Sequence, residues 1–174
     1  QVPDEVFGAP FLPPVTDGSG QDRNLLRRAS QLLADSGCPI KDGKRRLPNG
    51  DQFRIEFLLD EPALQAHHAP YVKNLAVLGI EASVRLVDPV QFSARVDDFD
   101  FDTVIQRFSM SSTPGDAMRT FFSSQVADVK GSQNLSGIKN PAIDALIERI
   151  IAADNRDELR TACRAFDRVF RAGR

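Results

Sequence analysis

A run of hydroxyl side chains between residues 107 and 115 is the part of the sequence best suited to hold a polar ligand. Hydroxyl groups and loop amides donate and accept hydrogen bonds, while an aromatic ring and a thioether add apolar contact. The predicted ligand-contacting residues are Arg107, Phe108, Ser109, Met110, Ser111 and Ser112. This mixture suits a peptide-like ligand. From composition alone a solvated loop ending at Pro114-Gly115 is the simpler interpretation, and only its position after a predicted strand favours binding.

A second polar loop, residues 131–138, carries an asparagine between two glycines. The Asn134 side chain could bond the backbone of a ligand or that of its own turn, and turn formation is the simpler interpretation. The predicted contact residues of this loop are Asn134, Ser136, Gly137 and Ile138.

The residue types that usually perform catalysis form no known catalytic motif. The sequence contains no G-x-S-x-G elbow, P-loop, G-x-G-x-x-G or H-E-x-x-H pattern. His67 and His68 are neighbours on a predicted helix, so they point in different directions and do not form one metal-binding face. The acidic residues within 97–102 alternate with phenylalanines, which favours a solvated strand entry over a metal site. We therefore expect neither enzyme activity nor a cofactor.

Two other classes of function remain open on these residues. A small α/β hydrolase could use a serine from the 109–112 loop, but it would lack a base held close to that serine. A doubly wound regulatory or interaction domain is the other alternative.

Alternating strand and helix patterns predict an α/β core that would position both loops. The expected elements in chain order are strand 52–59, helix 62–78, strand 80–87, a short helix from Asp88-Pro89 to residue 96, and strand 99–108. Strands joined by helical crossovers pair in parallel, and ligands bind at the carboxyl ends of such strands. That rule selects residues 59–62 and 107–115, and we expect them at one edge of the sheet.

The segments around this core are predicted from their apolar spacing and their breaking residues. A helix over 22–36 ends before Gly37, and residues 41–50 form a polar loop with a basic run, Lys44-Arg45-Arg46. Residues 109–139 are expected to be mostly loop. Two amphipathic helices, one after Asn140-Pro141 and one near 155–172, carry apolar stripes that we interpret as core faces.

Composition excludes several classes of partner. The 174 residues are 41% apolar, enough for a hydrophobic core, and the net charge of −2 gives no reason to expect nucleic acid as a partner. No apolar run approaches the length of a membrane span. Cys38 and Cys163 are too few and too far apart for a disulfide framework or a zinc site.

Because the sequence begins without Met and stops after an amphipathic helix, we expect a piece of a longer protein that has lost any signal peptide.

Several segments resemble, in order and spacing, the family 5 extracellular solute-binding proteins, the dipeptide and oligopeptide receptors of ABC importers. The segments concerned are residues 28–37, 75–80, 99–102, 134–138 and 140–144. They cover nearly the whole chain but only the second lobe of such a receptor. Residues 17–20, 112–115, 131–134 and 165–169 look most like the subgroup associated with uptake of microcin C and related peptides.

The resemblance implies a type II periplasmic-binding-protein lobe, with a mainly parallel sheet flanked by helices. Residues 1–20 would form an extended or inter-lobe arm and residues 21–174 the lobe. The implied partners are a peptide or peptide-like solute, the missing first lobe and a membrane permease, and the implied location is the periplasm. Many relatives place an aspartate near the position of Ser111 to pair with the ligand ammonium, so that interaction is not expected of this lobe.

Overall fold

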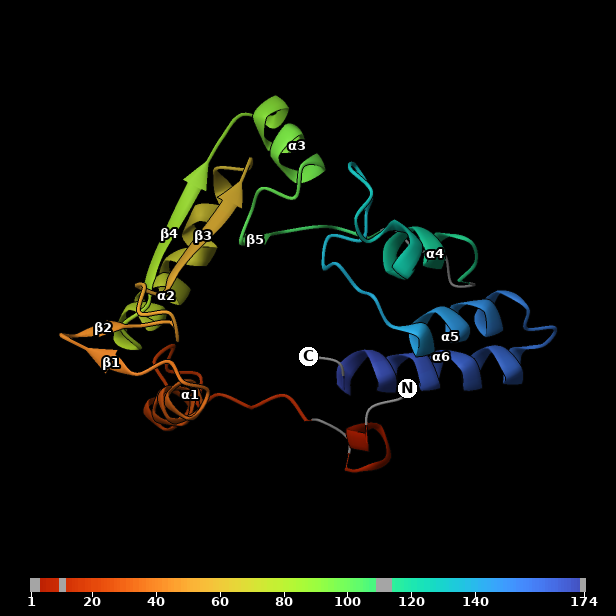
Figure 1. Cartoon of the computed structure of the whole chain (residues 1–174), viewed down its shortest axis with the longest axis horizontal. Coiled ribbons are helices and arrows are strands. Elements are labelled where there is room, and N and C mark those ends of the chain that lie inside the picture. Colours follow the sequence, from red (N-terminus) through yellow and green to blue (C-terminus); the bar gives the residue numbers. More distant parts are fainter. Residues whose placement is uncertain (1–3, 10–11, 109–113, 173–174) are drawn as a thin grey trace. The chain divides into compact units, whose positions relative to one another are not determined.

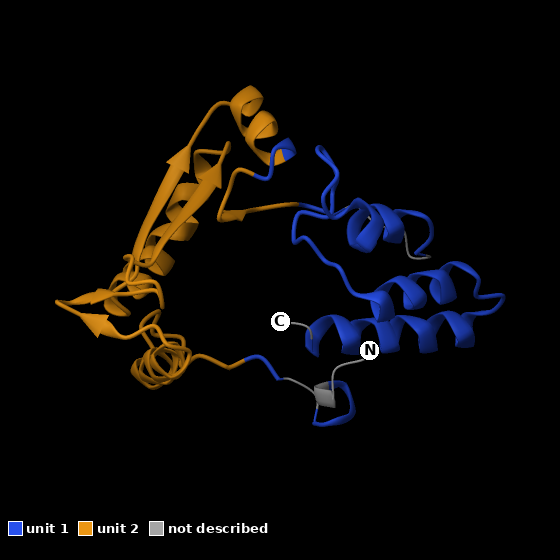
Figure 2. Ribbon diagram, in the orientation of Figure 1, with its two compact units in different colours: residues 1–13, 97–99, 107–174 blue, residues 14–96, 100–106 orange. Residues whose placement is uncertain are grey.

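The computed structural model describes residues 4–9, 12–108 and 114–172. The chain divides into two compact units, which Figure 2 shows in different colours. Unit 1 comprises residues 1–13, 97–99 and 107–174, and unit 2 comprises residues 14–96 and 100–106. Each unit has its own hydrophobic cluster.

Unit 2 contains the sheet and the helices that cover it (Figure 1). Its elements are α1 (Arg23–Asp35), β1 (Ile40–Lys41), β2 (Lys44–Arg45), β3 (Arg54–Leu59), α2 (Ala63–Val77), β4 (Glu81–Leu86), most of α3 (Pro89–Asp97) and β5 (Thr103–Val104). The main sheet has the order β4-β3-β5, and both pairs are parallel. The predicted parallel α/β core is therefore confirmed.

The core of unit 2 lies between this sheet and helices α1 and α2. Phe57 of β3 packs with Leu75 and Leu78 from the end of α2 and with Ile80, which precedes β4. Apolar side chains of α1, including Leu26 and Leu33, pack against the same cluster. The amphipathic stripe of α1 is thus a core face. The side chain of Asp22 caps this helix by accepting from the amides of residues 24 and 25.

The third strand is much shorter than the predicted 99–108. Only Thr103 and Val104 pair with β3, opposite Phe57 and Leu58. At the start of β5, hydrogen bonds from side chains take the place of the backbone pairing with β3. The Glu56 amide donates to the Asp102 carboxylate at 2.8 Å, and Thr103 Oγ1 donates to the Glu56 carbonyl at 3.0 Å. Phe99 has a positive φ of 55°, which an extended strand does not permit.

The predicted polar loop 41–50 instead begins with a β-hairpin. Strands β1 and β2 pair antiparallel, with Asp42 and Gly43 at its turn, and both have positive φ. Asp-Gly is a favoured sequence for a two-residue hairpin turn of this kind. The basic composition of the segment masked this local signal.

Arg45, at the end of β2, is 1% exposed, so the basic run is not uniformly solvated. Its guanidinium donates to the Leu78 carbonyl at 2.9 Å, the Cys38 carbonyl at 2.9 Å and Ser30 Oγ at 2.8 Å. Leu78 caps the C-terminus of α2, where carbonyl groups lack helical partners and favour a cation. Arg45 therefore joins the hairpin to α1 and α2.

Gly79, which follows α2, allows the backbone of the hairpin at Arg45 to lie close to the end of that helix. Its carbonyl accepts from the Arg45 amide at 2.7 Å, and a Cβ added at Gly79 would lie 2.9 Å from the same nitrogen. Its φ of +78° also belongs to the left-handed region that favours glycine.

Unit 1 is helical. Its elements are η1 (Asp4–Phe7), α4 (Ala117–Phe122), η2 (Ser124–Val126), α5 (Pro141–Ile151) and α6 (Arg156–Ala172). Ile143, Ile147 and Ile150 of α5 form its buried centre together with Met118 and Val169, and Cys163 packs against them. The predicted core faces of α5 and α6 are confirmed. Val6 of η1, within the predicted arm, joins the same cluster.

Candidate functional site

Phe108, in the described part of the first predicted loop, belongs to an aromatic cluster. The Phe108 ring packs edge-on against Phe121, with centroids 4.8 Å apart, and lies 6.2 Å from the Phe122 centroid. Phe108 nevertheless keeps 45% of its surface exposed. It therefore offers an apolar surface on a ring held by two neighbours. Arg107, just before it, is exposed.

Helix α4 supplies these two neighbours. Met118 and Phe121, three residues apart, are both buried, and Phe122 packs against the core of unit 1. Phe122 also contacts Phe166 and Phe170 of α6, with centroids 5.4 and 5.6 Å away. These contacts fix the end of α4 on the helical core.

The second predicted loop is tied to the same end of α4 through Asn134. This side chain is fully buried, and its Nδ2 donates to the Ser123 and Ile138 carbonyls, each at 3.0 Å. Its Oδ1 accepts from the Ile138 amide at 3.0 Å. Both amide hydrogens are thus used within the chain, and the role of Asn134 in the structure is to close its own loop.

The closed loop leaves the residues between Asn134 and Ile138 on the surface. The Gly137 amide donates to the Asn134 carbonyl at 3.0 Å, and Gly137 has a φ of 61°. Ser136 and Gly137 are exposed, and Ile138 is half-buried. A rigid turn therefore presents one hydroxyl and exposed backbone.

The structure thus anchors both predicted segments on the last turn of α4. Phe108 contacts Phe121 and Phe122, and Asn134 bonds the next carbonyl, that of Ser123. The other predicted contacts of the first loop, Ser109, Met110, Ser111 and Ser112, lie outside the described residues.

Sequence reasoning missed helix α4 because it assigned residues 109–139 mostly to loop. The signal was present, since Met118, Phe121 and Phe122 follow the i, i+3, i+4 spacing of a helical face. The competing Ser, Gly and Pro residues before this short helix hid it.

Among the described residues, perturbed acid and base groups are confined to ion pairs, one loop aspartate and one thiol. Hydrogen bonds from Arg119 lower the pKa of Glu148, and a hydrogen bond to Asp98 raises the pKa of Lys130. Burial raises the pKa of the Cys163 thiol, and both cysteines are free. The described residues contain no cluster of three or more His, Cys, Asp or Glu side chains that could hold a metal.

His68, the base that a hydrolase would need, has structural contacts. Its Nδ1 lies 2.7 Å from the Leu64 carbonyl, and its ring centroid is 5.1 Å from that of Phe57. It belongs to unit 2, as does the predicted loop 59–62, whereas the 107–115 loop belongs to unit 1. The serines that such a hydrolase would use, residues 109–112, lie outside the described residues.

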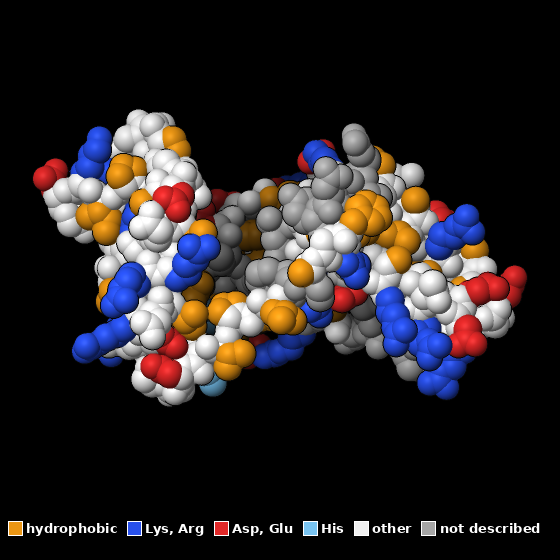
Figure 3. Space-filling view, turned by 90° about the horizontal axis from the view of Figure 1, so that it is seen from below, with side chains coloured by type: hydrophobic (Ala, Val, Ile, Leu, Met, Phe, Trp, Pro, Cys, Tyr) orange, Lys and Arg blue, Asp and Glu red, His pale blue; other side chains and the backbone are white. Residues whose placement is uncertain are grey.

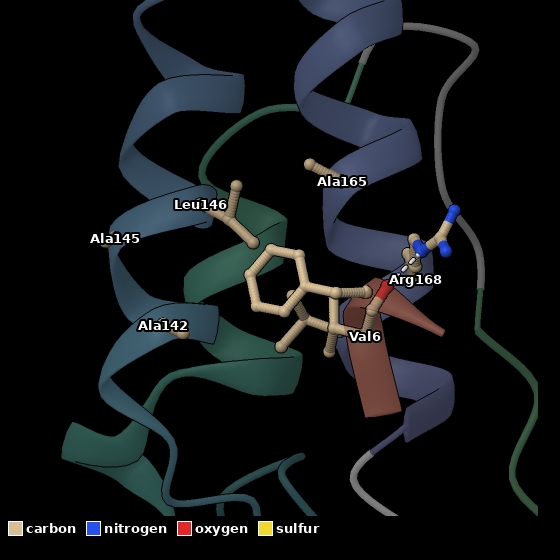
Figure 4. Close-up of a pocket in the computed structure, with 8 residues that line it drawn as sticks. Val6, Ala142, Ala145, Leu146, Ala165 and Arg168 are labelled. Atoms are coloured by element: carbon tan, nitrogen blue, oxygen red, sulfur yellow. Dashed lines mark hydrogen bonds between the residues drawn. The ribbon is translucent and has the colours of Figure 1, made fainter. Parts of the chain in front are cut away.

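An apolar groove of about 640 Å³ lies between α5, α6 and η1 of unit 1 (Figure 4). Leu146 and Ala165 line it from the two helices, and Val6 lies at its floor. Arg168 donates to the Val6 carbonyl and, at 2.6 Å, to the Gly8 carbonyl, which holds η1 against α6. None of the described residues predicted to contact ligand lines this groove.

Comparison with known proteins relates this chain to one segment of longer bacterial proteins. The chain is 41% identical over 173 residues to the probable peptide-binding protein YejA of Agrobacterium fabrum, which covers 99% of this chain and 28% of that protein. It is 34% identical over 172 residues to the peptidoglycan-binding protein YepA of the same organism, with the same two coverages. The chain is homologous to one segment of larger bacterial binding proteins. No family model matches it.

Solved structures show the same fold. The periplasmic oligopeptide-binding protein of Thermotoga maritima aligns with a TM-score of 0.73 at 17% identity, covering 83% of this chain and 28% of that one. The oligopeptide-binding protein AppA of Bacillus subtilis, solved with a nonapeptide, gives 0.70 at 19% identity, covering 83% and 29%. The predicted fold of a periplasmic-binding-protein lobe is confirmed. The relatives named here are binding proteins by name, which agrees with the expectation of no catalysis.

The chain spans about 28% of the length of these curated relatives. None of the described helices is long and apolar enough to cross a membrane.

Proposed function

We propose that this chain forms one wall of the solute site of a periplasmic peptide-binding protein that delivers its ligand to an ABC importer. The similarity to the Agrobacterium peptide-binding protein over 99% of the chain is the observation that carries the proposal. Capture is non-covalent, and a second lobe closes over the solute. The finer assignment, to the subgroup that takes up microcin C and related peptides, belongs to the same proposal.

The anchoring of two segments on α4 supports a defined site. In this proposal Phe108 contacts an apolar part of the solute, and Ser136 with the exposed backbone of Gly137 bonds its polar groups. Arg107, Ser109, Met110, Ser111, Ser112 and Ile138 complete the predicted wall. Asn134 positions the second segment through its own hydrogen bonds.

The decisive experiment replaces the matching segment of the Agrobacterium protein with this chain and titrates the chimera with short peptides by calorimetry. We expect the chimera to bind peptides that the parent binds. Because a single wall encloses little of a ligand, we expect the 174-residue chain alone to bind the same peptides weakly or undetectably. A folded chimera that binds no parental ligand contradicts the proposal, as does micromolar binding by the isolated chain.

Two substitutions test the wall residues in the chimera. Phe108→Ala removes an exposed aromatic contact and should weaken binding about tenfold. Phe7→Ala, which alters an exposed ring elsewhere in unit 1, is the matched control and should leave binding within about twofold. Equal loss in both variants excludes a specific role for Phe108.

The same titration distinguishes two solute classes. YepA is a peptidoglycan-binding protein by name, so cell-wall peptides are tested beside ordinary oligopeptides. Preference of the chimera for a muropeptide over a linear peptide of equal length would assign the ligand to cell-wall fragments.

A further inference from the structure

A polar hollow of about 780 Å³ lies in unit 2, beside the β1–β2 hairpin and the start of β3. Three cationic side chains and two carboxylates line it, namely Lys44, Arg46, Arg54, Asp51 and Asp102. In Figure 3, Lys and Arg side chains are spread over the part of the molecule that Figure 2 assigns to unit 2 as well as over the part that it assigns to unit 1.

The carboxylates of the hollow already have partners. Asp102 accepts from the Glu56 amide at 2.8 Å, and Asp51 accepts from Asn49 Nδ2 at 2.9 Å. Arg54 pairs with Glu81 at 3.3 Å. The two carboxylates and Arg54 therefore already have hydrogen-bond or ion-pair partners within the chain.

Two cations of the hollow, by contrast, have no side-chain partner within the described chain: Lys44, which is exposed, and Arg46, which is half-buried. A partly desolvated guanidinium favours a carboxylate partner because charge-assisted hydrogen bonds are stronger than neutral ones. These two side chains are the groups that an anionic partner would meet.

The backbone holds both cations in place. Successive side chains of a strand point to opposite faces, so the buried Arg45 directs Lys44 and Arg46 to the other side. The Arg46 amide donates to the Pro39 carbonyl at 2.9 Å, and the Leu47 amide donates to the Asp51 carbonyl at 2.8 Å. The two cations thus stand on a backbone that needs little ordering on binding.

We propose that this hollow docks an acidic segment of a protein partner, with Lys44 and Arg46 each pairing with a carboxylate. A hollow of this size has two cations, Lys44 and Arg46, two residues apart on the same face of the strand. It therefore fits a chain that bears more than one carboxylate better than a single small ion. The lining carboxylates Asp51 and Asp102 reduce the net positive charge of the hollow, which favours singly charged carboxylates over the more densely charged groups of a polyphosphate. The residues that line the hollow belong to unit 2, whereas those of the proposed solute wall belong to unit 1.

The test titrates fluorescently labelled hexaglutamate into the 174-residue chain at low ionic strength and follows fluorescence anisotropy. The wild-type chain should bind the peptide, and binding should weaken as salt is added. The double variant Lys44→Glu, Arg46→Glu should bind at least about tenfold more weakly, which corresponds to about 1.4 kcal/mol. The milder pair Lys44→Gln, Arg46→Gln, checked for folding by circular dichroism, should show the same direction.

Matched controls separate a specific site from general attraction. Arg27→Glu, Lys73→Glu changes two exposed cations of the helices in unit 2 by the same total charge and should stay within about twofold of wild type. Phe7→Ala, which alters an exposed ring of unit 1 outside the proposed solute wall, should leave hexaglutamate binding unchanged. The proposal is overturned by absent binding, by equal loss in the two Glu double variants, or by inorganic phosphate competing as well as the peptide does.

Discussion

At the scale of single residues, Arg45 is a buried charge that is stabilised without a counter-charge. Its guanidinium is surrounded by neutral oxygens, from Ser30, Cys38 and Leu78, and no carboxylate pairs with it among the residues that the structure describes. The partial negative charge at the C-terminus of α2 takes the place of an acid. Removing the guanidinium would leave these acceptors unsatisfied in a site that excludes water.

We predict that Arg45→Met lowers the free energy of unfolding of unit 2 by about 3 kcal/mol, because buried acceptors lose a charged donor. Urea titration followed by circular dichroism measures the change. Lys44→Met, at the exposed neighbouring position, should change stability by less than about 0.5 kcal/mol. Similar losses in the two variants would show that the interior hydrogen bonds of Arg45 contribute little.

A second residue-scale prediction concerns the Asn134 amide. Asn134→Ala should destabilise unit 1 by about 2 kcal/mol, because the Ile138 amide and two carbonyls lose their partner. Hydrogen exchange should rise first at residues 134–138. Ser136→Ala, at an exposed position of the same loop, is the control and should leave exchange unchanged.

At the scale of elements, an exposed ion pair joins α4 to α5. Arg119 of α4 donates to both carboxylate oxygens of Glu148, at 2.7 and 2.5 Å, and also pairs with Asp116. The pair holds the helix that anchors both segments of the candidate site. Because it is solvated, its contribution to stability is modest and depends on salt.

The pH dependence of unit 1 should report on this pair. Hydrogen bonds from Arg119 lower the pKa of Glu148 below its ordinary 4.5, so the stabilisation is complete above that value and disappears as pH falls through the lowered pKa. We expect the melting temperature to fall less steeply between about pH 5 and pH 3 in Glu148→Gln than in wild type.

Arg119→Gln should show the same shallower pH dependence, and the double variant should add nothing further. A slope in either single variant as steep as that of wild type would exclude this pair as a source of acid sensitivity.

At the scale of the whole molecule, two hydrophobic cores occupy one chain. Ile147, 1% exposed, lies in the core of unit 1, and Leu75, 7% exposed, lies in that of unit 2. The two buried clusters share no member. Substitutions in one core should therefore act mainly on the unit that contains it.

We predict that Ile147→Ala accelerates hydrogen exchange in α5 and α6 but leaves the amides of β3 and β4 protected, with a loss of about 2–5 kcal/mol in unit 1. Leu75→Ala is the reciprocal variant and should accelerate exchange in α2, β3 and β4 alone. Uniform acceleration across the chain in both variants would mean that the two units unfold as one cooperative body.

Predictions that rest on neighbouring residues agreed well with the structure. The spacing of Ile143, Ile147 and Ile150 predicts a buried helical face, and Asn140 caps that helix through the Ala142 amide at 2.9 Å. The hairpin turn at Asp42-Gly43 was equally local, yet the surrounding basic residues led to the prediction of a plain loop. Of the candidate site, its segments were predicted from sequence, but their shared anchor on α4 was not.

The sequence by itself determined the succession of strands and helices along the chain and hence the parallel α/β class, because apolar periodicity, caps and breaking residues act over a few neighbouring positions. Only the tertiary structure decided which polar side chains are buried and what they bind. Arg45 reaches a carbonyl 33 residues away, and Asn134 reaches one 11 residues away. Partners at such separations are selected by the packing of whole elements, and burial then makes their hydrogen bonds obligatory.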